Sequence, residues 1–96
     1  MILTFGDRRT EDLFHGTGSA RVRSLPPDVV RVALRKLDLV EAAHRLQDLR
    51  VPPGNRLELL HGDLKGFHSV RVNAQWRLVF RWSADGARDV RLVDYH

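Results

Sequence analysis

Three consecutive residues near the C-terminal end of the sequence, Asp94, Tyr95 and His96, carry side chains that suit acid–base chemistry. A histidine titrates near neutral pH, and a carboxylate and a phenol can position or stabilise charge around a phosphate group. The same residues would be ordinary as the polar end of a chain, because chain ends are commonly exposed. A functional role is favoured by their position, directly after a predicted strand and beside a row of arginines.

That row consists of Arg71, Arg77 and Arg81, which the strand pattern places on one face of a sheet. Closely spaced guanidinium groups repel one another unless an anion lies between them, so these arginines predict a surface that binds phosphate. The alternative is a solvated face on which each arginine pairs with a nearby acid. Candidates for such pairing are Asp63, Asp89 and Asp94.

Two histidines, His61 and His68, flank a glycine-bounded turn at residues 62–66. They could serve as a general base and a substrate contact, or as metal ligands. Their spacing matches no standard zinc pattern and the sequence contains no cysteine, so we expect no metal site. Within the turn, Asp63 and Lys65 either shape the loop or, in the case of Lys65, add a cation to the phosphate-binding surface.

The composition describes a folded, basic chain. Its 96 residues allow one domain, residues 1–96, with one modest core. Sixteen basic residues stand against twelve acidic ones, and fourteen of the sixteen are arginines. Arginine binds phosphate oxygens in pairs and stacks on bases, which suits a nucleic-acid surface. Proteins from high-GC genomes are also rich in arginine, so composition alone leaves both interpretations open.

The sequence also indicates a compartment. No apolar stretch approaches the roughly 20 residues that a membrane helix needs. Residues 1–5 lack the charged and apolar blocks of a secretion signal. The absence of cysteine excludes disulfides and fits a reducing environment. We therefore expect a cytoplasmic protein that does not contact a membrane.

The first half of the sequence predicts a short strand followed by helices. Residues 2–5 form an apolar run typical of a first or edge strand, residues 8–14 predict a short helix, and residues 17–24 predict a loop. A long helix opens at Pro26 and Pro27 and ends near Ala43, before a proline-rich segment that stops all helix. Its predicted buried face is Val30, Ala33, Leu34, Leu37 and Val40, and its predicted exposed face is Arg31, Arg35, Lys36, Asp38 and Glu41.

The second half predicts strands at residues 56–60, 67–72, 75–82 and 88–94, which are separated by turns. Residues 75–82 alternate most clearly: Trp76, Leu78, Phe80 and Trp82 share one face, and Gln75, Arg77, Val79 and Arg81 share the other. We therefore predict a two-layer α+β fold. The N-terminal strand and the helices pack on one face of a twisted, mainly antiparallel sheet, and the arginines lie on its uncovered face.

Four segments of the sequence resemble the HigB family of bacterial toxins, within the RelE/ParE superfamily. They are LRVPPGNRL at residues 49–57, LLHGDLKG at 59–66, SVRVNAQWRLVFRW at 69–82 and VDYH at 93–96. The long helix and the N-terminal strand agree with that family in length and order. The resemblance therefore covers nearly the whole chain.

The resemblance implies a RelE-like fold and a type II toxin–antitoxin system. It further implies cleavage of mRNA in the A site of the 70S ribosome, without a cofactor or a metal, by attack of a ribose 2′-hydroxyl on the adjacent phosphorus. Such a reaction needs a base at the hydroxyl, cations around the phosphoryl oxygens and an acid at the departing 5′ oxygen. The expected partner is a HigA-like antitoxin with a helix-turn-helix, through which alone the toxin would contact DNA.

By position in these motifs, Arg77 matches the family's arginine that holds the scissile phosphate, and Asp94, Tyr95 and His96 match its functional tail. His96 would act as acid or base, Tyr95 would stack or donate a hydrogen bond, and Asp94 would orient its neighbours. Two positions depart from the pattern. Glu58 stands where some members have a histidine, and His61 stands where many have a lysine, so His61 becomes a candidate base or cation.

Two other functions remain open at this stage. The same scaffold could block another target, such as a gyrase, without catalysis. The arginine excess alone would also fit a basic RNA-binding module, for which salt-sensitive binding is expected.

Overall fold

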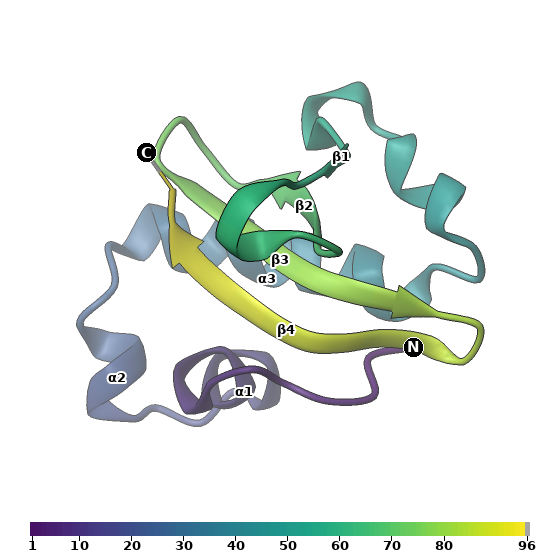
Figure 1. The fold of residues 1–96 in the computed structure, drawn as a ribbon. Helices are drawn as coiled ribbons and strands as arrows, with labels where there is room; N and C mark the ends of the chain where they lie inside the picture. The colour runs from purple at the N-terminus through teal and green to yellow at the C-terminus, as the bar shows by residue number, and fades with distance from the viewer. Residues whose placement is uncertain (96) are drawn as a thin grey trace.

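The helices and the sheet of this protein form two layers (Figure 1), and the computed structural model describes residues 1–95. The helical elements are α1 (Arg8–His15), α2 (Ala20–Arg23), α3 (Pro27–Ala42) and the 3-10 turns η1 (Leu46–Arg50), η2 (Pro53–Asn55) and η3 (Gly62–Leu64). The strands are β1 (Glu58–Leu59), β2 (His68–Arg71), β3 (Trp76–Ser83) and β4 (Gly86–Asp94), paired antiparallel in that order. The predicted α+β arrangement is confirmed.

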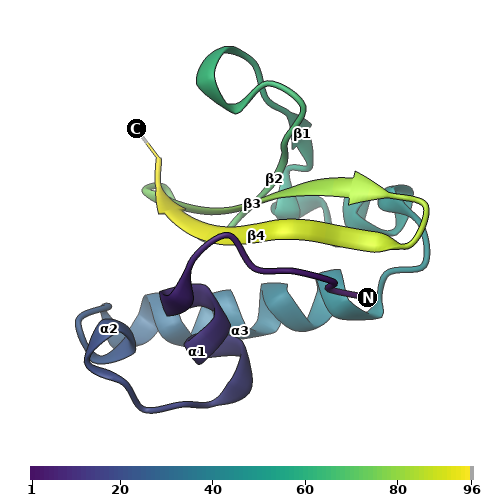
Figure 2. The ribbon, with the colours of Figure 1, turned by 60° about the horizontal axis from the view of Figure 1, so that its bottom comes forward.

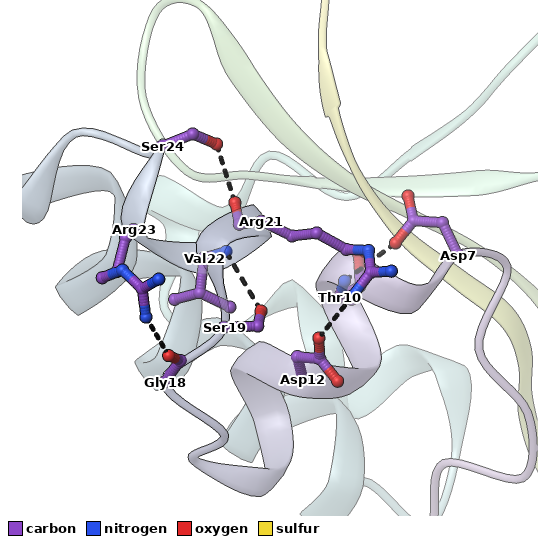
Figure 3. A network of polar contacts seen from close by, with 9 residues as sticks. All are labelled: Asp7, Thr10, Asp12, Gly18, Ser19, Arg21, Val22, Arg23 and Ser24. Atoms are coloured by element: carbon purple, nitrogen blue, oxygen red, sulfur yellow. Dashed lines mark hydrogen bonds and ion pairs between the residues drawn. The ribbon is translucent and has the colours of Figure 1, made fainter.

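Side-chain caps define the first two helices. Asp7 caps α1 by accepting a hydrogen bond from Thr10 N at 2.8 Å, and Gly16 ends it in the left-handed conformation that glycine adopts most easily. Ser19 starts α2 in the same way, with Val22 N as donor at 3.4 Å (Figure 3). The prediction of a loop at residues 17–24 was therefore wrong, because this one-turn helix depends on its cap rather than on an apolar pattern.

The long helix α3 packs its apolar side on the sheet, as its three- and four-residue spacing predicts. Its buried residues include Ala33, Leu37 and Val40, while Val29 takes the buried position that the sequence assigned to Val30. The sequence also placed Lys36 on the exposed face, which is wrong. Lys36 is only 9% exposed, and burial lowers the pKa of its ammonium group, with a smaller contribution from the neighbouring charge of Arg35.

Lys36 is buried because it binds the proline-rich loop. Its Nζ donates to Asn55 Oδ1 at 2.5 Å, and the Asn55 amide donates in turn to the carbonyls of Leu49 and Val51 at 3.1 and 3.3 Å. Asn55 is fully buried. These bonds fix η1 and η2 to the helix, and β1 follows directly from that loop.

The main core lies between the helices and one face of the sheet. From the sheet it contains Leu78, Phe80, Val90 and Leu92, with the rings of Trp76 and Trp82 half-buried at its border. The alternation read in residues 75–82 is thereby confirmed. Residues 2–5 run along the outer edge of β4, with isolated parallel bridges from Ile2 and Phe5 instead of a full strand.

The opposite face of the sheet is not uncovered, which corrects the sequence prediction. The segment between β1 and β2, including η3, lies over it on the side away from the helices (Figure 2). Leu60 and Phe67 from this segment bury Val79 in a second small core. The strand predicted at residues 56–60 covers only Glu58–Leu59 in the structure. It does not begin at Arg56, because the φ of 46° at that residue is not an extended conformation. No helix within residues 1–95 is both long and apolar enough to cross a bilayer.

The buried contact between Lys36 and Asn55 predicts a large effect on stability. Asn55→Ala should lower the free energy of unfolding by about 2–3 kcal/mol, because it leaves a buried ammonium group and two carbonyls without partners. Denaturant unfolding measures this loss. Gln47→Ala removes an exposed amide from the same loop and should change stability little, and equal effects of the two substitutions would contradict this account.

Candidate functional site

Arg77 occupies the centre of the sheet face that points away from the helices. Its position in β3 lies opposite Arg71 of β2 and Val93 of β4. The side chain is only 14% exposed, although it carries a permanent charge. A guanidinium group this far from water must be hydrogen-bonded or paired.

Two other strands supply the partners of Arg77. Its Nη1 donates to the hydroxyl of Ser69 in β2 at 2.8 Å, and its Nη2 donates to Glu58 Oε1 in β1 at 3.3 Å. Ser69 is fully buried, whereas the Glu58 side chain is half-exposed. The buried Ser69 hydroxyl thus fixes the guanidinium of Arg77, and the Glu58 carboxylate beside it remains accessible to a substrate.

Tyr95 completes this group from the end of the chain. Its ring lies 5.5 Å from the guanidinium carbon of Arg77, in the arrangement of a cation–π contact. Tyr95 N also donates to Gln75 O at 2.6 Å, which extends the pairing of β3 and β4 by one residue. Tyr95 is therefore the described residue of the predicted tail that contacts Arg77.

Asp94 takes a different position from Tyr95. It lies opposite Trp76 in the strand register, and its Oδ2 accepts a hydrogen bond from Gln75 Nε2 at 2.9 Å. It therefore helps to hold the tail against the start of β3, beside the Tyr95 that contacts Arg77. His96, the third residue of the predicted group, lies outside the described residues.

Arg81 lies further along the same face than Arg77. Its Nε is 3.5 Å from Asp89 Oδ2, so one of the acids proposed as pairing partners is the partner here. Arg71 lies directly opposite Arg77 and is half-buried. Arg88 and Arg91 of β4 belong to this face as well, because Arg88 lies opposite Arg81 and Arg91 lies opposite Val79. We call these five residues, Arg71, Arg77, Arg81, Arg88 and Arg91, the arginine face.

The turn residues His61 and Lys65 are exposed, at the two ends of η3. Within residues 1–95, neither makes a side-chain hydrogen bond or ion pair to Arg77 or Glu58. Their proposed roles, His61 as base or cation and Lys65 as a phosphate contact, stay predictions.

His68 lies on the other side of the sheet from Arg77. It stands opposite Phe80, on which its ring stacks at a centroid distance of 6.2 Å. It lines a cleft of about 230 Å³ between η1 and β1. Burial lowers the pKa of its imidazole. His61 and His68 are thus separated, and across residues 1–95 no three His, Asp or Glu side chains cluster closely enough to hold a metal ion.

The sequence did not indicate that Glu58 and Ser69 hold Arg77. Glu58 was noticed only as a departure from the family's pattern, and Ser69 was not singled out. Both reach Arg77 because Glu58 lies opposite Ser69, and Ser69 lies opposite Val79, two residues from Arg77. That register is the only signal, and it requires the pairing of three strands to be known.

Comparison with known proteins assigns the family. The profile described as "RelE-like toxin of type II toxin-antitoxin system HigB" matches residues 4–96. The chain belongs to the HigB-like toxin family. It is 42% identical to Toxin HigB-1 of Vibrio cholerae over 96 residues, which cover all of this chain and 98% of that protein. It is also 37% identical over 68 residues to an uncharacterised protein of Haemophilus influenzae, covering 71% and 67% of the two chains.

A solved structure agrees with the fold of this HigB-like toxin. A chain in the YoeB-YefM complex from Staphylococcus aureus superposes with a TM-score of 0.59 over all of this chain and 98% of that one. The sequence identity is 16%, so this likeness concerns the fold alone. Family and fold together identify a RelE-like toxin of a type II toxin–antitoxin system.

The buried His68 predicts a pH dependence of stability. Because its folded pKa lies below its ordinary value, the unfolded chain binds the proton more readily, and a fall in pH through about 6.5 favours unfolding. His68→Gln should therefore lose less stability than the wild type between pH 7.5 and 5.5 in denaturant unfolding. His44→Gln, which removes an exposed histidine, serves as the control and should follow the wild type. Parallel curves for wild type and His68→Gln would contradict the prediction.

Proposed function

We propose that this HigB-like toxin is an endoribonuclease that cleaves mRNA in the ribosomal A site in the cytoplasm and thereby stops growth. The observation that carries the proposal is the group around Arg77. A guanidinium held by Ser69 and Glu58, with the Tyr95 ring beside it, offers a fixed cation, a carboxylate and a phenol at one place. Fixed charges of this kind stabilise the charge that develops on a phosphoryl group in the transition state.

The reaction proposed is a transfer of the phosphorus from one ribose oxygen to another. The 2′ oxygen bonds to phosphorus while the bond to the 5′ oxygen breaks, which leaves a 2′,3′-cyclic phosphate and a 5′-hydroxyl. The proton of the 2′-hydroxyl passes to a base, and the 5′ oxygen receives a proton from an acid. Protons and electrons balance, so the step needs no further reactant.

The geometry suggests how these roles are divided. Arg77 binds the non-bridging oxygens of the scissile phosphate with the edge of its guanidinium that remains accessible. Glu58, whose half-exposed carboxylate lies 3.3 Å from Arg77, is placed to accept the proton of the 2′-hydroxyl. His96 is the acid in this scheme on its sequence position next to Tyr95, and Tyr95 stacks on a base or donates a hydrogen bond. Asp94 holds the tail in place through Gln75.

The remaining arginine face supports binding of the RNA backbone. Arg71 lies beside Arg77 and adds a second cation at the scissile phosphate. Arg81 binds the RNA backbone at a position further along β3. Lys65 and His61 lie in the exposed turn next to this face and contribute charge or hydrogen bonds. Ribosome dependence is part of this proposal because of the resemblance to the family, and membership of the HigB-like toxin family supports it.

We further infer a HigA-like antitoxin with a helix-turn-helix as the partner. The family is defined by its place in toxin–antitoxin systems, and the structurally similar YoeB was solved in complex with YefM. Contact with DNA would pass through that antitoxin.

Arg77→Ala tests the proposed phosphate contact. The rate of mRNA cleavage should fall by about 10²–10³-fold, as on loss of a single group that stabilises the transition state. Mapping of mRNA 5′ ends after induction, combined with growth curves, measures this. Arg31→Ala removes an exposed arginine from α3, on the other side of the sheet, and should retain wild-type cleavage.

The same experiment separates the other functions. Wild-type growth arrest with DNA damage and intact mRNA would replace the nuclease by a gyrase-directed toxin. RNA binding without arrest or cut ends would indicate a simple binding module. Unchanged cleavage by Arg77→Ala, or after deletion of His96, would show that the assigned site is wrong.

Glu58→Gln tests the base. The amide keeps the size of the side chain and can still accept a hydrogen bond from Arg77, but it cannot take up the proton. The rate constant of the cleavage step should therefore fall by about 10²–10⁴-fold while RNA binding is retained. Asp63→Asn, an exposed acid in the neighbouring turn, should cleave normally, and a Glu58→Gln variant as active as this control would exclude Glu58 as the base.

A further inference from the structure

The arginine face contains two pairs of arginines that lie directly opposite each other across neighbouring strands. Arg71 opposes Arg77 between β2 and β3, and Arg81 opposes Arg88 between β3 and β4. Residues opposite each other in antiparallel strands point to the same face, and like charges there are destabilising. Negative charge close to both pairs therefore stabilises the sheet.

Each pair has one arginine in an ion pair: Arg77 with Glu58, and Arg81 with Asp89 at 3.5 Å. Arg91 of β4, which lies opposite Val79, adds a third guanidinium beside Arg81 and Arg88. Within residues 1–95, Asp89 pairs with Arg81, whereas Arg88 and Arg91 have no ion pair, and Asp85 of the hairpin turn pairs with none of the three. The unbalanced charge favours a bound anion in addition to Asp89.

A buried phenyl ring organises this second cluster. The guanidinium carbons of Arg81 and Arg91 lie 4.4 and 5.1 Å from the centre of the Phe67 ring, which is only 6% exposed. Both charges are therefore held at the same aromatic side chain by cation–π contacts. Phe67 is itself fixed, because it packs on Val79 and Leu60 in the second core.

The backbone also fixes the cluster. The pairing of β3 and β4 shifts between Val79 and Arg81, and Asp89 adopts a φ of 54° at this bulge. Bulges redirect side chains and are common next to functional sites. On the other side, the Arg91 stem packs on Gly6, where any side chain would overlap it. The arginines are thus positioned before a ligand binds.

The cluster is separate from the proposed cleavage site. Arg77 and Arg81 are four residues apart on β3, which corresponds to roughly 13 Å along an extended strand. The guanidinium of Arg77 is held at Ser69 and Glu58, whereas those of Arg81 and Arg91 lie over the Phe67 ring. An anion at Arg81 is therefore a different phosphate from the one at Arg77.

We propose that Arg81, Arg88 and Arg91 form a second phosphate-binding subsite, which holds the RNA backbone at a phosphate beyond the neighbours of the scissile one. The proposal rests on the nuclease function and extends it. The sheet then binds RNA at two fixed points, and the spacing between them sets which bond reaches Glu58 and Tyr95. The occupant is a nucleic-acid phosphate rather than an acidic protein segment, because the subsite lies on the same face as Arg77 and follows the same strand.

Neutral phosphate substitutions in the substrate test this subsite. Ribosome-bound mRNA would carry one methylphosphonate, moved in turn along the positions flanking the cut. Wild type should cleave more slowly when the methylphosphonate replaces the scissile phosphate. It should also cleave several-fold more slowly when the methylphosphonate replaces one further phosphate, which is not a neighbour of the scissile one. The Arg81→Gln, Arg88→Gln double variant should cleave more slowly and lose sensitivity to the second position only. Arg31→Gln, a matched loss of charge on α3, should keep both sensitivities.

The results separate failure of the subsite from failure of the nuclease proposal. Wild-type cleavage with no second sensitive phosphate, or a double variant as sensitive as wild type, would overturn the subsite alone. If wild type does not cleave, binding to a 2′-O-methyl single-stranded RNA still tests it. The slope of log affinity against log salt concentration should then be smaller in magnitude for the double variant than for wild type, by about 0.7 for each lost phosphate contact. If the slope of the double variant equals that of Arg31→Gln, the subsite is overturned. The subsite is also overturned if the double substitution weakens only antitoxin binding.

Discussion

The half-hidden guanidinium of Arg77 is the constraint on which the rest of the site depends. A charge with 14% of its side chain exposed is stable only if its hydrogen bonds are made, and its two partners come from two other strands. The pairing register of β1, β2 and β3 must therefore be correct to within a single residue. A slip by one position would turn Arg77 toward the helices and exchange every contact on both faces.

That register depends on contacts far from the arginine. β1 has only two residues and cannot define its own position. It is placed by the loop before it, which the buried bond from Lys36 to Asn55 fixes to the long helix. The ammonium group of a helix residue thus helps to position Glu58 beside Arg77, although the two sites are on different sides of the sheet. A charge buried at some cost fixes a unique loop conformation here.

The two faces of the sheet serve different purposes. One face supplies the main core with the helices, and the other carries a smaller core of Leu60, Phe67 and Val79 with arginines on both sides of it. The small core covers the middle of this face and leaves the arginines at its borders. Positive charge can therefore be held at two fixed places, which flexible surface arginines on a solvated sheet could not achieve.

The sequence alone determined the helix-then-sheet order, the long amphipathic helix and the two faces of β3, because these follow from local periodicity. The motifs near Arg77 and the C-terminal end also carried the family. The sequence misplaced Lys36, because a lysine on a helix is normally solvated and its buried partner is 19 residues away. It likewise missed the partners of Arg77. Only the tertiary structure decided these contacts, since cross-strand register and loop docking depend on residues distant in the chain, which no local pattern records.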